Sequence, residues 1–146
     1  MLSVGCVYHD PNFKFSDGSD GNKLFIVLGK DNSFYTVAKT TSQQHSRKVA
    51  NGCQGIGGLW HSWFHPLSLN RCFKSDTWIC FNEFYTLRKT QTDASFRADL
   101  IVLKCAKSAM SPDICAMLNC ALLSIDLEGQ DETRIKTAFS DLNCKV

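Results

Sequence analysis

Acidic residues are missing from a long stretch of this chain. Between Asp31 and Asp76 there is no aspartate or glutamate, although 21% of the 146 residues are charged. The same stretch carries five basic residues, a formal charge of +5, together with three histidines and several aromatic residues. Lysine and arginine neutralise phosphates, and aromatic rings stack on bases. The composition is therefore typical of a surface that binds a polyanion, although a solvated basic loop would look the same.

Other absences exclude whole classes of protein. No apolar run approaches the ~18 residues that span a bilayer, so no membrane partner is expected. Residues 1–5 lack the basic and apolar segments of a signal peptide. The sequence therefore predicts a cytoplasmic protein whose eight cysteines stay reduced. No C-x-x-C pair occurs, so neither a metal site nor a cofactor is predicted.

The length and the hydrophobic content predict one folded domain over residues 1–146. Hydrophobic residues make up 44% of the chain, and there are only three prolines. The net charge is only +2, because six acids from Asp113 onward outnumber the three basic residues there. The basic character is therefore local, and one part of the surface is expected to meet a polyanion.

Apolar and alternating segments predict mainly strands. Strands are expected over residues 5–8, 23–28, 33–39 and 77–81, and residues 84–87 could continue the sheet. Residues 10–22 are rich in turn signals, and residues 43–70 are expected to be irregular because four glycines fall between positions 52 and 58.

Two helices are predicted to close the chain, over about residues 111–125 and 130–142. Ser111 suits the N-cap of the first helix and Pro112 its first turn. The apolar stripes of both helices are interpreted as core-packing surfaces.

Three segments, taken in order, resemble the MazF/PemK family of toxin endoribonucleases. They are residues 21–28, residues 38–43 with the sequence Ala-Lys-Thr-Thr-Ser-Gln, and residues 111–123. The resemblance implies an α+β fold, with a small, strongly bent antiparallel β-barrel of the SH3-like type over about residues 4–110 and C-terminal helices. It also implies a homodimer that cleaves single-stranded RNA and is blocked by a cognate antitoxin protein.

The resemblance places the catalytic groups at two strand ends. Lys23 stands where the family has its catalytic arginine, and Leu24 stands where a proline usually follows. Thr40 is the closest match to the catalytic threonine or serine, with Thr41 next. A lysine is a point charge and lacks the bidentate fork of arginine.

The residues themselves suggest the same roles. RNA cleavage through the substrate's own 2′-hydroxyl needs a base, an acid and positive charge on the phosphate. The predicted catalytic residues are Lys23, Thr40, Thr41, Ser42 and His45, the last as the proton-transfer candidate. The predicted RNA-binding residues are Lys39, Arg47, Lys48 and Trp63. A surface lysine, turn-forming hydroxyls and an exposed loop histidine remain the structural alternatives.

The leading hypothesis is a metal-independent endoribonuclease toxin, with no cofactor. The alternatives are a non-catalytic nucleic-acid-binding module on the same fold, a protein-interaction factor, and a thiol-based redox or metal protein.

Overall fold

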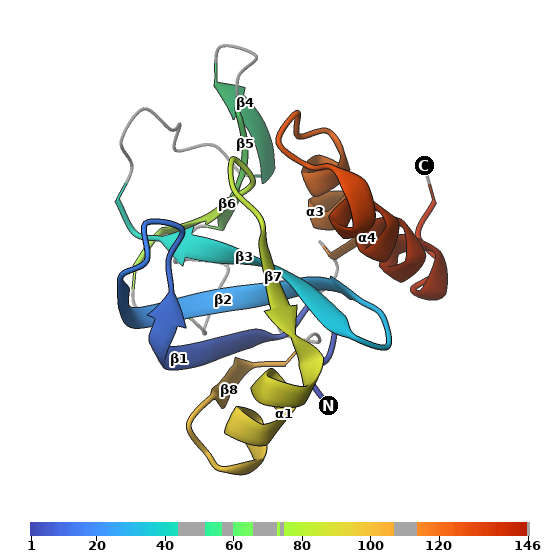
Figure 1. The fold of residues 1–146 in the computed structure, drawn as a ribbon. Helices are drawn as coiled ribbons and strands as arrows, with labels where there is room; N and C mark the ends of the chain where they lie inside the picture. The colour runs from blue at the N-terminus through green and yellow to red at the C-terminus, as the bar shows by residue number, and fades with distance from the viewer. Residues whose placement is uncertain (44–51, 57–59, 66–72, 74, 107–113, 146) are drawn as a thin grey trace.

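The computed structural model describes residues 1–43, 52–56, 60–65, 73, 75–106 and 114–145 (Figure 1). This part of the chain has a mixed α+β fold, with an antiparallel sheet of eight strands and three helices. The strands are β1 (Val7–Lys14), β2 (Asp20–Lys30), β3 (Phe34–Thr41), β4 (Gly52–Ile56), β5 (Trp60–His65), β6 (Thr77–Cys80), β7 (Tyr85–Arg88) and β8 (Val102–Cys105). The helices are α1 (Lys89–Arg97), α3 (Ile114–Leu122) and α4 (Gly129–Asp141).

A small, strongly bent β-barrel was predicted, and in the described ranges the sheet is not closed into a barrel. The strand order is β4-β5-β6-β3-β2-β1-β8, with β7 paired to β3 off this path. Closure would require the two terminal strands, β4 and β8, to pair, and they lie at opposite ends of the order. β3 carries two successive partners along one edge, β7 at residues 34–37 and β6 at residues 40 and 41.

The first hairpin is longer than the turn signals predicted. Residues 10–22 were expected to be mostly turn, but β1 continues to Lys14 and β2 begins at Asp20. The register of the two strands shifts between Asp10 and Phe13, which is a β-bulge around Pro11. A bulge accommodates a proline within a strand because the ladder is already interrupted there.

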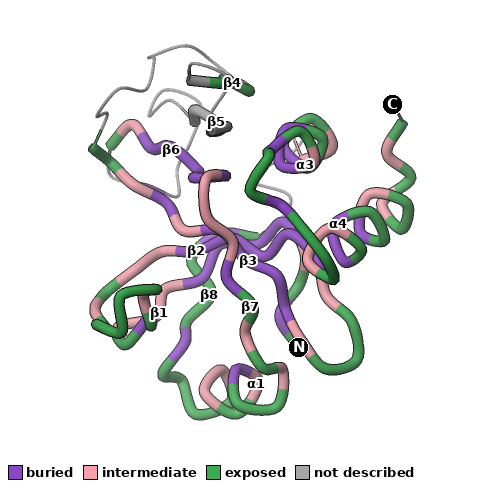
Figure 2. The backbone as a smooth tube through the Cα atoms, turned by 45° about the horizontal axis from the view of Figure 1, so that its top comes forward, coloured by how far each residue is buried: buried purple, intermediate pink, exposed green. Residues whose placement is uncertain are grey.

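The apolar run in β2 is explained by burial on both faces of the sheet. Ile26 and Leu28 join one hydrophobic cluster, which α3 and α4 complete, whereas Phe25 and Val27 join a second cluster on the opposite face. Figure 2 shows these buried segments of β2 and β3 in the middle of the molecule. A strand covered on both faces needs a continuous apolar sequence, as predicted for residues 23–28.

Helix α4 packs directly on β2 because Gly29 has no side chain. A Cβ at this position would overlap the carbonyl group of Arg134 and lie 2.8 Å from the backbone nitrogen of Ile135. Arg134 is 6% exposed and forms ion pairs with Asp31, at 2.7 Å, and with Asp131, at 3.1 Å. The helix is thus held by both close packing and charge.

Gly29→Ala should destabilise the protein by about 2 kcal/mol, because the added methyl group pushes α4 off the sheet. Gly21→Ala is the matched control in the same strand, since its Cβ would meet only Phe15, at 3.6 Å. The control should change stability by less than about 0.5 kcal/mol. Urea unfolding of both variants measures the difference, and equal midpoints would contradict the close approach of α4.

Five elements differ from the predicted arrangement. β4 and β5 form a hairpin within the stretch predicted to be irregular. α1 and β8 were not predicted at all. The first C-terminal helix ends at Leu122, so Ile125 lies outside it and is 66% exposed. The predicted cap at Ser111 lies outside the described residues.

None of the helices in the described ranges has the length and apolar character needed to cross a bilayer.

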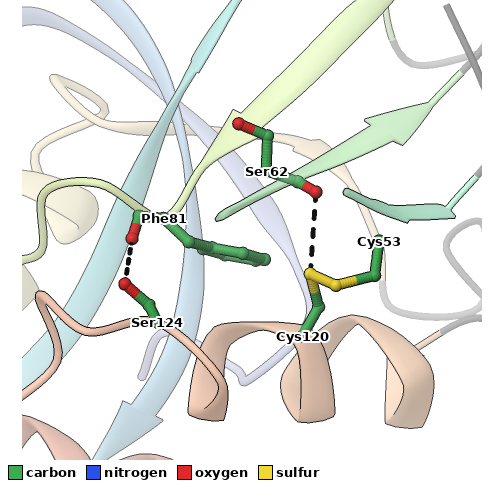
Figure 3. The surroundings of a disulfide bond; sticks show 5 residues. All are labelled: Cys53, Ser62, Phe81, Cys120 and Ser124. Atoms are coloured by element: carbon green, nitrogen blue, oxygen red, sulfur yellow. Dashed lines mark hydrogen bonds between the residues drawn. A yellow bond between two sulfur atoms is a disulfide. The ribbon is translucent and has the colours of Figure 1, made fainter. Parts of the chain in front are cut away.

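The prediction of reduced cysteines is wrong. One disulfide joins Cys53 in β4 to Cys120 in α3 (Figure 3), and a second joins Cys115 to Cys144. Cys105 is also disulfide-bonded. The reduced state had been predicted because residues 1–5 lack the features of a signal peptide, and the sequence does not specify the pairing, because the bonded cysteines are separated by 67 and 29 residues in the two assigned bonds.

Candidate functional site

A cavity of about 500 Å³ lies where β1, β2, β3, β6 and β8 approach one another. Its cationic and titratable lining consists of Lys23, Lys104 and His9. Four hydroxyl side chains also line it, those of Thr40, Ser42, Ser75 and Thr77. None of the described lining residues is a carboxylate. The cavity is thus suited to an anion that accepts several hydrogen bonds.

Two β-bulges shape the cationic side of the cavity. His9 pairs with Leu24 on one side and with Val102 of β8 on the other. The register of β1 and β8 then shifts, leaving Lys104 as the extra residue of β8. A bulge redirects side chains, and here Lys104 lines the cavity beside His9. The bulge in β1 lies opposite Asn22, the residue before Lys23.

The amine of Lys23 is partly desolvated. Burial lowers its pKa from the usual value of 10.5, Cys80 acts in the opposite direction, and the charge of Lys39 lowers it further. The side-chain amine of Lys23 forms no hydrogen bond or ion pair with another described residue. A partly desolvated amine without a nearby counter-charge favours the binding of an anion, because the anion stabilises the protonated form of the amine.

The hydroxyls of the cavity are not equivalent. Thr40 is 5% exposed, and its Oγ1 donates to the carbonyl oxygen of Leu24 at 3.0 Å. Thr77 donates in the same way to the carbonyl of Ser75, at 2.9 Å. The hydroxyl protons of both threonines are therefore already engaged in hydrogen bonds within the protein. Ser42 is exposed and has no such internal bond to a described residue, so it is the hydroxyl from the end of β3 that can donate to a ligand.

Three of the predicted catalytic residues, Lys23, Thr40 and Ser42, thus meet at one cavity. Thr41 does not line it, and its Oγ1 accepts a hydrogen bond from the backbone of Gln43 at 3.1 Å. This difference follows from the alternation of side chains along a strand. His45 lies outside the described residues.

The two predicted RNA-binding residues in the described ranges, Lys39 and Trp63, do not line the cavity. Lys39 lies away from the cavity lining and forms an ion pair with Glu83 at 3.4 Å. Burial acts to lower the pKa of Lys39, but Tyr85 and Glu83 outweigh it, so its pKa is raised. Arg47 and Lys48 lie outside the described residues. Trp63 is 6% exposed and belongs to the hydrophobic core, so the expectation that its ring stacks on a base is wrong for this conformation.

Sequence reasoning missed His9 and Lys104. His9 falls between the predicted first strand, residues 5–8, and the turn-rich residues 10–22, and Lys104 lies in a strand that was not predicted. The local sequence gave one sign of β8, because Lys104 stands among the apolar residues of the segment 102–105. Their meeting depends on the pairing of β1 with β8, which local sequence does not specify.

No metal-binding cluster of three or more histidine, cysteine or acidic side chains occurs within the described ranges. No protein-family model matches the chain, and no curated protein sequence matches it either. The resemblance to the MazF/PemK family therefore stays a prediction carried by the three segments quoted above.

Proposed function

We propose that this chain is an endoribonuclease that cleaves single-stranded RNA at the cavity containing Lys23, without a metal ion. The main support is the convergence of two lysines, a histidine and hydroxyl groups on one cavity without a lining carboxylate. The proposal includes an SH3-like, MazF/PemK type of fold, and a homodimeric toxin paired with a cognate antitoxin. These last features rest on the sequence resemblance alone.

The chemistry would proceed within the RNA itself. The 2′-oxygen attacks the adjacent phosphorus, the 2′-O–P bond forms, and the P–O5′ bond breaks. A base takes the proton of the 2′-hydroxyl, and an acid protonates the departing 5′-oxygen. The products are a 2′,3′-cyclic phosphate and a 5′-hydroxyl. No oxidant, reductant or further reactant is needed.

Each role has a candidate side chain in the cavity. Lys23 and Lys104 would neutralise the charge that develops on the non-bridging oxygens. Ser42 would donate a hydrogen bond to the same phosphate. His9 would transfer the proton, because histidine is the side chain most often used as a general acid or base. His45, the histidine favoured by the sequence, remains the competing candidate.

A non-catalytic RNA-binding module is the second candidate function. Two observations favour it: a lysine stands at the position of the family's arginine, and the proton of Thr40 is already bonded to Leu24. Such a module would use the same cavity and show the same salt dependence. It would differ only in leaving the RNA intact.

Incubation with a long single-stranded RNA in EDTA separates the two functions. The wild-type protein should cleave, and Lys23→Gln combined with Lys104→Gln should reduce cleavage by about 10²–10³-fold, because charge on the phosphate is lost. Lys14→Gln is the control, since Lys14 is exposed and pairs with Asp20 outside the cavity. Salt-sensitive binding without cleavage would support the module, and the absence of any salt-sensitive binding would contradict both functions.

A further inference from the structure

A second cavity, of about 430 Å³, lies at the C-terminal end of helix α4. Its described lining comes from the N-terminal segment, from Lys30 at the end of β2, from Ala106 after β8 and from the last turn of α4. None of these residues lines the cavity that contains Lys23. The volume is in the range of small-molecule binding sites. This second cavity is therefore separate from the site used in the proposed function.

Close packing of α4 on β2 places the last turn of the helix beside Lys30. Gly29, the residue before it, lets the backbone of α4 approach the strand. Further along the helix, Ala138 is 5% exposed, and it lines the cavity together with Asp141 and Leu142. The contact that holds the helix on the sheet thus also brings a carboxylate and an amine to one cavity.

Apolar residues form much of the remaining lining. Cys6 is 7% exposed and Val4 is partly buried, and both line the cavity with Ala138. The backbone nitrogen of Gly5 donates to the carbonyl oxygen of Val27 at 2.8 Å, which fixes the N-terminal segment on β2. A surface of this kind can remove the hydrocarbon part of a ligand from water without having to be ordered first.

The amine of Lys30 supplies the positive charge of the cavity. Its Nζ donates to the carbonyl oxygen of Leu2 at 3.1 Å. Leu2 is fully buried, and its own N–H donates to the hydroxyl of Tyr35 at 3.0 Å, so the anchor of the amine is itself fixed. Within the described ranges Lys30 has no carboxylate partner. An ammonium group has three donors, so the remaining two can serve a ligand.

Asp141 supplies the negative charge, at a position where a carboxylate is locally unfavourable. It is the final residue of α4, and the last turn of this helix carries no basic residue. The C-terminal end of a helix is partially negative, so it favours a cation and disfavours an acid. The carboxylate of Asp141 forms no ion pair with any described residue. A cationic group bound there would relieve the repulsion.

We propose that this cavity binds a small zwitterion of the amino-acid or short-peptide class. The carboxylate of the ligand accepts hydrogen bonds from Lys30, and its ammonium group donates to Asp141. An apolar side chain of the ligand packs on Val4, Ala138 and Leu142. Lys30 and Asp141 line one cavity but do not pair with each other. A zwitterion satisfies both charges at once, whereas an ion of one sign leaves the other charge without a partner.

NMR titration of the full chain, with its disulfides intact, tests this proposal with two probes, leucine and leucyl-leucine. At least one probe should shift the methyl signals of Val4 and Ala138 saturably, with a Kd on the order of 1 mM or lower. The tighter probe distinguishes a free amino acid from a peptide. Acetylating its amine or amidating its carboxylate should each weaken binding by about tenfold or more, because a charged hydrogen bond is lost. Unsaturable shifts with both probes, or equal affinity for the blocked and free forms, would contradict the proposal.

Two variants assign the charges. Asp141→Asn should bind the acetylated and the free probe equally well, and Lys30→Gln should do the same for the amidated and the free probe. Glu132→Gln is the matched control, because Glu132 lies on the same helix, pairs with Lys136 and does not line the cavity. It should keep the affinity and the discrimination of the wild type.

Asp141→Asn decides the outcome if Lys30→Gln disturbs the N-terminal segment. Asp141 is exposed, and its replacement removes no ion pair with a described residue, so the variant should fold normally. If Asp141→Asn still discriminates against the acetylated probe as strongly as the wild type, the zwitterion site is overturned. The readout is independent of RNA cleavage, so it stands whether or not the proposed function holds.

Discussion

Replacing His9 with glutamine should lower the rate of RNA cleavage by about 10²–10⁴-fold, the usual contribution of a positioned general acid or base. Glutamine retains hydrogen-bonding capacity but cannot carry the proton. RNA affinity should stay within about threefold of the wild type, because Lys23 and Lys104, the proposed phosphate-binding residues, are unchanged. Single-turnover cleavage of a labelled RNA and anisotropy of a non-cleavable analogue measure the two quantities.

Two comparisons make this prediction specific to His9. Asp10→Asn changes the next residue of β1, which does not line the cavity and whose carboxylate accepts the backbone N–H of Asn12 at 2.9 Å. This variant should cleave at a rate close to that of the wild type. His45→Gln tests the histidine that the sequence favoured. A large loss in His45→Gln with full activity in His9→Gln would reject His9 as the proton-transfer group.

Replacing Arg134 with methionine should destabilise the protein by about 3 kcal/mol, because methionine fills the space but leaves two carboxylates without their cation. Nε of Arg134 donates to Asp31 at 2.7 Å, and one Nη donates to Asp131 at 3.1 Å. The guanidinium also lies over the ring of Phe34, with 5.1 Å to its centroid. The value is at the lower end for a buried ion pair, because 41% of the Asp31 side chain is exposed.

Urea unfolding of Arg134→Met and of a matched variant, Lys136→Met, checks this prediction. Lys136 forms an exposed pair with Glu132 on the same helix, and its loss should cost less than about 0.5 kcal/mol. Similar midpoints for the two variants would show that the buried pair does not hold α4 on the sheet.

The effect of Arg134→Met should also depend on pH. Burial acts to raise the pKa of Asp31, but the backbone N–H groups of Ser33 and Phe34, together with Arg134, outweigh it and lower the pKa below its usual 3.8. The ionised carboxylate therefore stabilises the folded state above pH 3.8, and this contribution is lost as the pH falls through the lower folded-state pKa. The difference between wild type and variant should be largest near pH 7 and should shrink below about pH 4.

Much of the central sheet could be predicted from local sequence. The continuous apolar run of β2 directly encodes its burial, and the alternating sequence of β3 predicted a strand, although residues 35–38 are buried on both faces. Local signals failed where long-range pairing decided the outcome. The turn signals of residues 10–22 suggested a loop, but the ladder with β2 tolerates a bulge around Pro11. The glycines of β4 likewise suggested a loop, and pairing with β5 overrode them.

The candidate site was predicted in part. Lys23 and the hydroxyls at the end of β3 were identified because a cation and hydroxyl groups stand at neighbouring strand ends. The alternation of side chains along β3 could have predicted that Ser42 and Thr41 point to opposite faces. The hydrogen bond from Thr40 Oγ1 to the carbonyl oxygen of Leu24 could not be predicted from the sequence. His9 and Lys104 meet only because β8 pairs with β1, across about ninety residues of chain.

The sequence by itself determined a basic region free of acids, a buried central strand and two amphipathic C-terminal helices, because composition and periodicity are local properties of the chain. The tertiary structure decided which basic residues line a common cavity, namely Lys23 and Lys104 from outside that region, which cysteines form disulfides, and that the sheet stays open. Those outcomes depend on contacts between segments far apart in sequence, and strand register and bulges fix them.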